Sequence, residues 1–368
     1  MSEKVSRRQM MQVAGVAALA AAGPQSVEAQ AMKNWPPVLG DDTPKIVVGG
    51  GRDADRLRLW KQVGLDYIMG SFGRAPWTVE SIKEGMAVAE EAGLKAIISM
   101  YPGSMNDIIN GGPDRDKEIE DWITSIRAAG EAGLITMEYN FYANRLMEGY
   151  KEEIGRGGSG YTAYDYELSK NLPPKEGAKT STRAVQLDRA KYFLEAVVPE
   201  AEKANVRRAL HPNDPPVPIS RGNEQIMATV EHWKDYLDLV KSPHNGMTFD
   251  CGVTREMGED PVAVARHLGR DRDCINHVHF RNVIVRTPYV DYTEVWLDEG
   301  YVNMFAVMRE LVAQKYPRSL YPEHPRAIDL DRNAEGGIRG QYPGGGGTAA
   351  QIYNVAYTKA MLQAALSV

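Results

Sequence analysis

Cysteine and excess positive charge are both scarce in this sequence. Its 368 residues include only two cysteines, Cys251 and Cys274, and no CxxC pair. Two isolated cysteines build neither a disulfide framework nor a zinc knuckle, so we expect separate roles for them. The formal net charge of -6 excludes the basic face with which a general nucleic-acid binder holds phosphates. We therefore expect no nucleic-acid partner.

Long hydrophobic runs are also missing, and this decides how the N-terminus is interpreted. The apolar run 13–23 is too short and too rich in Ala and Gly to span a bilayer, so no stable membrane insertion is expected. It follows Arg7 and Arg8 and precedes an Ala-Gln-Ala site at 29–31, the pattern of a twin-arginine export signal. We predict a signal peptide over residues 1–31, the export machinery as a partner, and a periplasmic protein. The alternative is an amphipathic N-terminal helix.

From residue 45 onward, short apolar runs alternate with amphipathic segments. The apolar runs cover residues 45–50, 65–72, 94–101, 134–141, 206–211, 246–251, 275–280 and 319–324. The helical pattern covers residues 52–63, 78–93, 116–133, 186–203, 224–241, 260–269, 302–315 and 348–366. Eight such pairs predict an α/β protein in which residues 32–368 form a single closed (β/α)8 barrel, a TIM barrel. An open doubly wound sheet is the alternative, weakened because no GxGxxG follows the first strand.

Two segments interrupt this alternation. Residues 142–185 are rich in Gly, Lys and Tyr, and we interpret them as a long insertion after the fourth strand. Residues 332–348 are rich in Gly. We expect both segments to fold over the barrel mouth, where loops control specificity and closure. The alternative is that they are disordered insertions.

Titratable side chains gather where the predicted strands end. In a (β/α)8 barrel the active site lies at these carboxyl ends. The chain places there Glu138, Tyr139 and Asn140 on the fourth strand, His211 on the fifth, Asp250 and Cys251 on the sixth, His277, His279 and Arg281 on the seventh, and Glu323 and His324 on the eighth. No role is given to the three histidines on predicted helices or loops, His232, His244 and His267.

Histidines and carboxylates at consecutive strand ends are typical of a metal site. Imidazole and carboxylate ligands suit Mn²⁺, Fe²⁺ or Zn²⁺, whereas a thiolate favours softer metals. We predict His211, His279 and Glu323 as ligands, with hydrogen-bonded packing inside the barrel mouth as the alternative. His277 lies deeper on its strand, so we expect it in the core or behind the ligands.

Several of these segments together resemble the pattern of the mannonate dehydratase family. The resemblance rests on LHPNDPP at 210–216, IS at 219–220, VHFRN at 278–282, EYNF at 138–141 and PEH at 322–324, and it covers roughly residues 45–365. This family belongs to the xylose-isomerase-like group of metal-dependent (β/α)8 barrels. The resemblance implies a divalent metal, Mn²⁺ or Fe²⁺, held by His211, a group that ends strand six, His279 and Glu323. It also implies His324 as the proton donor.

The sequence departs from the family pattern in three places. Asp250 stands where the family has a cysteine ligand, and Cys251 follows on the opposite face of the strand. We predict Asp250 as the ligand and keep Cys251 as the alternative, because a bulge could rotate it inward. Glu323 replaces an aspartate, which changes reach but not charge. Glycine stands where the family has a catalytic tyrosine, and we predict that Tyr342 in YPGGGGT substitutes for it.

The resemblance predicts a hydro-lyase that converts D-mannonate to 2-keto-3-deoxy-D-gluconate and water. This reaction needs Lewis-acid stabilisation of an enediolate and a general acid for the leaving hydroxyl. We predict His324 as this acid and Arg281 as the bidentate partner of the substrate carboxylate, with a structural ion pair as the alternative for Arg281. Asn140 and Tyr139 are predicted to contact substrate hydroxyls. Asp214, before two prolines, is equally well interpreted as a turn-former.

Two other functions are compatible with the same residues. A metal and two proton-transfer groups also describe an isomerase or epimerase that acts on another periplasmic sugar or sugar acid. A non-catalytic sugar binder is disfavoured, because binders rely more on aromatic stacking than on titratable groups. Many barrels of this kind pair, so a homo-oligomer is compatible with the sequence, which does not determine it.

Overall fold

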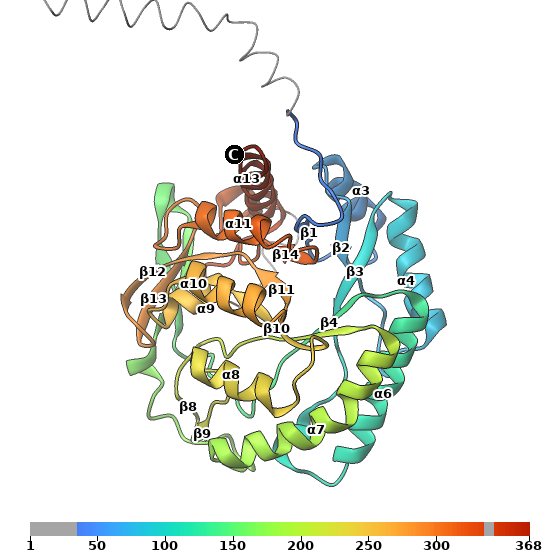
Figure 1. The fold of residues 1–368 in the computed structure, drawn as a ribbon. Helices are drawn as coiled ribbons and strands as arrows, with labels where there is room; N and C mark the ends of the chain where they lie inside the picture. Colours follow the sequence, from blue (N-terminus) through green and yellow to red (C-terminus); the bar gives the residue numbers. More distant parts are fainter. Residues whose placement is uncertain (1–34, 335–341) are drawn as a thin grey trace, which may run out of the picture.

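Eight parallel strands form a barrel in the computed structural model, which describes residues 35–334 and 342–368 (Figure 1). The strand order is β1-β14-β11-β10-β7-β4-β3-β2. The ring closes between β1 and β2 through a parallel bridge from Gly49 to Met69 and a hydrogen bond of 2.9 Å from Met69 N to Val48 O. The predicted (β/α)8 barrel is confirmed.

Every barrel strand overlaps one of the eight predicted apolar runs. The barrel strands are β1 (Lys45–Ile46), β2 (Tyr67–Met69), β3 (Lys95–Met100), β4 (Thr136–Tyr139), β7 (Arg207–Leu210), β10 (Asn245–Asp250), β11 (Ile275–His279) and β14 (Ser319–Tyr321). The strands are short because only a few residues of each run pair with both neighbours. Strands β4, β10 and β11 are buried on both faces, which explains why such runs are largely apolar and do not alternate.

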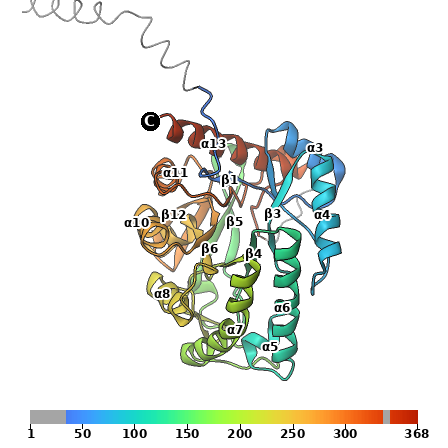
Figure 2. The same ribbon diagram turned by 45° about the vertical axis from the view of Figure 1, so that its right-hand side comes forward.

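Helices cover the outside of the barrel, as the alternating pattern predicts (Figure 2). The outer helices are α3 (Ala54–Gln62), α4 (Val79–Glu91), α6 (Arg115–Ala132), α7 (Arg183–Ala204), α8 (Val230–Leu239), α10 (Pro261–Arg266), α11 (Met304–Ala313) and α13 (Thr348–Leu366). Three shorter helices are α5 (Asn106–Asn110), α9 (Cys251–Glu256) and α12 (Asp329–Arg332). Helix α8 begins six residues later than predicted, because the Thr229 side chain caps it by accepting from His232 N at 3.1 Å. The residues before it form the hairpin β8 (Ile219–Ser220) and β9 (Asn223–Glu224).

A second, antiparallel sheet lies beside the barrel mouth. Its order is β12-β13-β6-β5, and its strands are β12 (Asn282–Thr287), β13 (Asp291–Val295), β6 (Gly160–Asp165) and β5 (Tyr150–Ile154). Two segments that are far apart in the chain, one after β4 and one after β11, therefore share a sheet. Residues 150–165 of the predicted insertion are folded into it.

The predictions for the N-terminus and for part of the Gly-rich segment fall on residues that the structure does not describe. The predicted signal peptide, residues 1–31, lies outside the described residues, as do residues 335–341 of the Gly-rich segment. Across residues 35–334 and 342–368, no helix combines the length and apolar character needed to cross a membrane.

Aromatic side chains fill the layer between β4 and helices α6, α7 and α8. The Tyr139 ring lies edge-on to Trp122 and Phe193, at centroid distances of 5.2 and 6.0 Å. Its hydroxyl is 2.8 Å from that of Tyr236 and accepts from Arg208 Nη1 at 3.4 Å. The prediction that Tyr139 contacts substrate hydroxyls is therefore wrong. Neighbours on a strand face opposite sides, and the residue before it faces the barrel interior.

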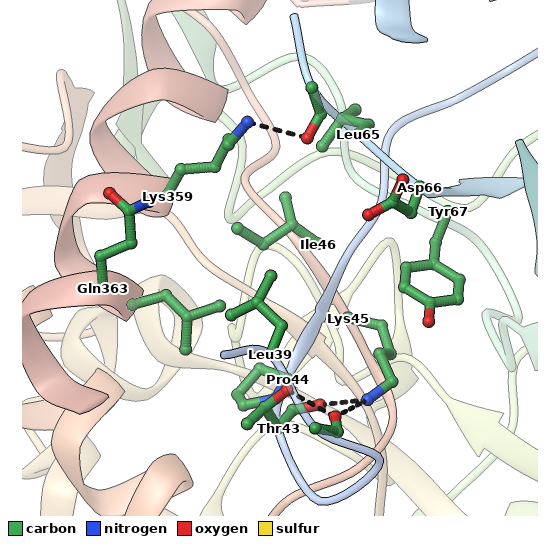
Figure 3. A pocket seen from close by; sticks show the side chains of 13 residues that line it. Leu39, Thr43, Pro44, Lys45, Ile46, Leu65, Asp66, Tyr67, Lys359 and Gln363 are labelled. Carbon is green, nitrogen blue, oxygen red and sulfur yellow. Dashed lines mark hydrogen bonds between the residues drawn. The ribbon is translucent and has the colours of Figure 1, made fainter. Parts of the chain in front are cut away.

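A small hollow of about 110 Å³ lies at the end of the barrel opposite the mouth, where β1 and β2 begin (Figure 3). Lys359 of α13 donates to the carbonyl oxygens of Val63 and Gly64 at 3.0 and 2.8 Å. Lys45 donates to Gly40 O at 2.7 Å. These ammonium groups tie α13 and the start of β1 to neighbouring loops, so they serve the closure of the barrel floor.

Tyr139→Phe removes one hydroxyl from the buried pair and deprives Tyr236 of this partner. We expect the free energy of unfolding to fall by about 1–2 kcal/mol, measured by urea denaturation. Tyr301→Phe is the matched control, because Tyr301 is exposed and surface changes usually alter stability by less than about 0.5 kcal/mol. Equal stability of the two variants would contradict the placement of Tyr139 in the core.

Candidate metal centre and active site

The four residues predicted as metal ligands meet at the carboxyl ends of the barrel strands. One ligand atom from each of His211, Asp250, His279 and Glu323 lies within 4.8 Å of all the others. They follow or end β7, β10, β11 and β14, four strands that are neighbours in the barrel. The β10–β11 register pairs Asp250 with His279, which sets these two side chains at the same height. All four residues are buried.

Hydrogen bonding directs one nitrogen of each histidine into this cluster. His211 Nδ1 is 2.7 Å from the carbonyl oxygen of Pro212, which can only accept, so Nδ1 carries the proton. The lone pair of His211 Nε2 then faces the cluster, where His279 Nδ1 lies 3.0 Å away. Glu323 Oε2 is 3.1 Å from His279 Nδ1. Asp250 Oδ2 is 3.8 Å from His211 Nε2 and also 3.8 Å from His279 Nδ1. The ligand atoms therefore converge on one point.

These residues fit a divalent cation. Two carboxylates are buried here, and Glu323 Oε1 has no hydrogen-bond partner among the described residues. The nearby Arg281 guanidinium is shared among five carboxylates, so a further cation between these two would offset the cost of burying their charge. A set of two imidazoles and two carboxylates suits Mn²⁺, Fe²⁺ or Zn²⁺.

Glu138 contacts the outer ring nitrogen of the predicted ligand His279, a role that the sequence did not predict. Its Oε1 lies 3.1 Å from His279 Nε2 and accepts from Thr248 Oγ1 at 2.8 Å. Burial would raise the pKa of Glu138, but His279 and His277 outweigh burial and hold it at about 2. A carboxylate behind a ligand histidine fixes its ring and raises its basicity. His277 itself lies deeper, as predicted, with Nδ1 2.7 Å from Ser319 Oγ.

The structure separates Asp250 from Cys251. The Cys251 thiol donates to the carbonyl oxygens of His279 and Arg281, both at 3.3 Å, so it faces the backbone of the next segment. Burial raises the pKa of this thiol, which keeps it protonated. The Asp250 carboxylate faces the cluster and also caps α9, where Oδ1 accepts from Val253 N at 2.7 Å. The geometry favours Asp250 over the alternative Cys251.

Arg281 is surrounded by protein carboxylates. Its Nε donates to Asp250 Oδ2 at 3.0 Å and its Nη1 to Glu256 Oε1 at 2.6 Å. Asp214, Glu294 and Glu323 also lie within 3.7 Å of the guanidinium. Only Nη2 has no hydrogen-bond partner among the described residues. These contacts favour the alternative, a structural ion pair, and the substrate contact of Arg281 stays a prediction.

His324 and Tyr342 lie next to the ligand cluster and to each other. His324 Nε2 is 3.5 Å from Glu323 Oε2, and Nδ1 is 2.8 Å from Glu294 Oε2. The Tyr342 ring lies 5.1 Å from the His324 ring, and Arg145 Nη2 donates to the Tyr342 hydroxyl. The predicted pair is thus brought together.

Two neighbours of this pair, Glu294 and Arg145, escaped the sequence analysis. Arg145 lies in the predicted insertion 142–185, and Glu294 lies on β13 between β11 and α11, so no strand-end rule points to them. A sequence signal existed only for Arg145, which lies six residues after the end of β4. Asn140 directly follows β4 and is half-buried at the same end of the barrel, and its substrate contact stays a prediction.

Comparison with known proteins identifies the family. The family model for D-mannonate dehydratase (UxuA) matches residues 47–180 and 178–365. The chain belongs to the mannonate dehydratase family. Mannonate dehydratase from Streptococcus suis (strain 05ZYH33) is 30% identical over 276 residues, covering 68% of this chain and 75% of that protein. Mannonate dehydratase from Enterococcus faecalis is 27% identical over 324 residues, covering 76% and 88%.

Solved structures agree with this assignment. The crystal structure of mannonate dehydratase from Streptococcus suis serotype 2 is similar with a TM-score of 0.77 and 28% identity, over 88% of this chain and 95% of that one. A xylose isomerase-like TIM barrel protein from Mycobacterium smegmatis has a TM-score of 0.54 at 15% identity, over 89% of this chain and 100% of that one, and supports the fold alone. The predicted family, fold and hydro-lyase class are confirmed, and mannonate dehydratases are metal-dependent.

Family membership also corrects the predicted location. The relatives that match this chain are named for the dehydration of a sugar acid, mannonate, and their names do not speak for export. The periplasmic location predicted from the first 31 residues is therefore wrong. A short apolar run flanked by arginines and small residues is a compositional pattern, and family membership outweighs it.

Metal content separates the two candidate ligands at the end of β10. Asp250→Asn should lower the bound metal at least about 10-fold, because a neutral amide replaces a ligand carboxylate. Cys251→Ser should retain the metal content of the unchanged protein, since the thiol faces backbone carbonyls. Elemental analysis of both purified variants measures this. Metal lost from Cys251→Ser and kept by Asp250→Asn would reverse the assignment.

Arg281→Met should reduce the free energy of unfolding by about 3–5 kcal/mol, because it leaves Asp250 and Glu256 buried without their cation. Urea denaturation measures the loss. Arg286→Met is the control: Arg286 pairs with Asp291 at the surface, where an ion pair contributes about 0–1 kcal/mol. A stable Arg281→Met protein with only a raised KM would restore Arg281 as the main substrate ligand.

Proposed function

We propose that this protein dehydrates D-mannonate to 2-keto-3-deoxy-D-gluconate and water. The observation that carries the proposal is the convergence of four ligand residues beside a histidine that can deliver a proton. The reaction removes a proton from the carbon next to the carboxylate and a hydroxyl from the following carbon. The resulting enol then rearranges to the 2-keto product.

His211, Asp250, His279 and Glu323 would hold the metal, with Mn²⁺ or Fe²⁺ as our assignment from the ligand set and the family. A bound divalent cation supplies Lewis-acid stabilisation to the substrate oxygens that gain negative charge. The role of the chain is to fix the ligand atoms. Glu138 does so from behind His279, at 3.1 Å from its outer nitrogen.

His324 is assigned the protonation of the leaving hydroxyl. Burial alone would lower its pKa, but Glu294 and Glu323 outweigh burial and raise it above the ordinary value. This shift favours the protonated ring, and Nε2 points towards Glu323 and the ligand cluster. A general acid must carry its proton before the reaction and lie within reach of the leaving group.

Tyr342 is assigned the role of the missing family tyrosine. Burial, and then Asp214, raise the pKa of Tyr342, so its hydroxyl stays protonated. It lies between Arg145 and the His324 ring. A protonated hydroxyl at this place is suited to donate a hydrogen bond to a substrate oxygen rather than to remove a proton.

Three side chains at the barrel mouth are candidates for contacts with the substrate. Arg281 Nη2 is buried and has no hydrogen-bond partner among the described residues, so it can offer a single hydrogen bond to the substrate. Asn140, half-buried after β4, can reach a hydroxyl at the same mouth. Arg145 is partly exposed, with 26% of its side chain accessible, and adds positive charge for an acidic substrate.

His324→Asn should lower kcat on D-mannonate at least about 100-fold while the metal content stays unchanged, because only the proton donor is lost. Release of the 2-keto-3-deoxy acid measures the rate. His267→Asn is the matched control, since His267 is half-buried directly after α10 on the outside of the barrel, where it pairs with Asp271. Bound metal without any turnover of D-mannonate by the unchanged protein would refute this substrate and direct the search to other sugar acids.

A further inference from the structure

His324 occupies a backbone conformation that needs support. Its φ is +46°, the left-handed region, and Pro325 follows it. Residues without special reason avoid this region, and the residue before a proline is pushed towards extended conformations. Arg326 Nε donates to His324 O at 2.9 Å and holds the peptide in place. The ring needs a second support, because a backbone contact does not determine which nitrogen faces the substrate.

Glu294 provides that support from the second sheet. It is fully buried on β13, where it pairs with Val283 of β12 on one side and Thr162 of β6 on the other. Its Oε2 is 2.8 Å from His324 Nδ1 and accepts from Arg326 Nη2 at 2.9 Å. A side chain on an inner strand is held on both sides, so the position of this carboxylate is well determined.

The contact determines which nitrogen of His324 exchanges protons. A carboxylate oxygen accepts, so the proton between the two groups resides on Nδ1. The other nitrogen, Nε2, is the one directed at the ligand cluster, 3.5 Å from Glu323 Oε2. A ring flipped about its axis would present a carbon atom to the substrate instead.

We propose that Glu294 is the positioning residue of His324, so that the inserted sheet completes the acid–base machinery at the barrel mouth. This inference rests on the proposed role of His324 in the dehydration. Glu294 acts by fixing the ring orientation and by keeping the Nδ1 proton in place. The proton that His324 gives to the leaving hydroxyl then departs from Nε2 only.

The kinetic test is a double-mutant cycle on D-mannonate. Glu294→Gln should lower kcat about 10- to 100-fold, with KM changed less than about 2-fold and metal content unchanged. In a His324→Asn background, Glu294→Gln should cause no further loss, because its effect passes through the ring. Glu153→Gln is the control, on β5 of the same sheet, where Glu153 accepts from Thr293 Oγ1 at 2.9 Å. An equal loss with and without His324 would overturn the proposal.

A spectroscopic arm keeps this inference separate from the choice of substrate. In protein labelled with ¹⁵N-histidine and loaded with diamagnetic Zn²⁺, long-range ¹H–¹⁵N spectra report which ring nitrogens carry protons. We expect the unchanged protein to show a protonated His324 Nδ1 with a slowly exchanging proton, assigned by its absence from His324→Asn. Glu294→Ala should abolish slow exchange. A proton bound only to Nε2, or an unchanged spectrum in Glu294→Ala, would refute the proposal even where D-mannonate is not turned over.

Discussion

The mouth of this barrel depends on how a concentration of buried negative charge is held together. Five carboxylates lie within 4 Å of the Arg281 guanidinium: Asp214, Asp250, Glu256, Glu294 and Glu323. A single guanidinium cannot pair with all of them, and burial makes unpaired charge expensive. Gly252 leaves the space that Arg281 needs, since a Cβ there would lie 2.7 Å from Arg281 Cγ. The rest of the charge is available for a metal ion and for the proton on His324.

This arrangement also explains why the second sheet belongs to the active site. β13 brings Glu294 against His324, and the segment before β5 brings Arg145 against Tyr342. Both strands of the pair β6–β13 are inner strands, so their side chains are held on two sides. The barrel provides the ligand residues from its strand ends, whereas the inserted sheet provides the groups that orient the proton donor. Loops alone would position these groups less well.

The sequence predicted the barrel because its local signals and its topology agree. Eight apolar runs separated by helical patterns have few other arrangements, and His211, His279 and Glu323 mark the carboxyl ends of three strands. Which residues of a strand face the barrel interior was harder to predict. β4 is buried on both faces, so nothing in its composition showed that Glu138 faces inward and Tyr139 outward. Glu294 was out of reach, because its position depends on pairing between β6 and β13, which are over 120 residues apart.

The three histidines at the mouth have different tasks because of what stands behind each ring. His211 is backed by the neutral carbonyl of Pro212, so burial lowers its pKa and its inner nitrogen keeps a lone pair for a metal. His324 is backed by the Glu294 carboxylate, which with Glu323 outweighs burial and raises the pKa of the ring. His279 faces the cluster through Nδ1 and has Glu138 behind Nε2, so a cation at the cluster takes the place of the ring's inner proton. The charge of the group behind the imidazole thus distinguishes His211 from His324. His279 is backed by a carboxylate, as His324 is, and differs from it because its other nitrogen faces both Asp250 and Glu323 of the cluster.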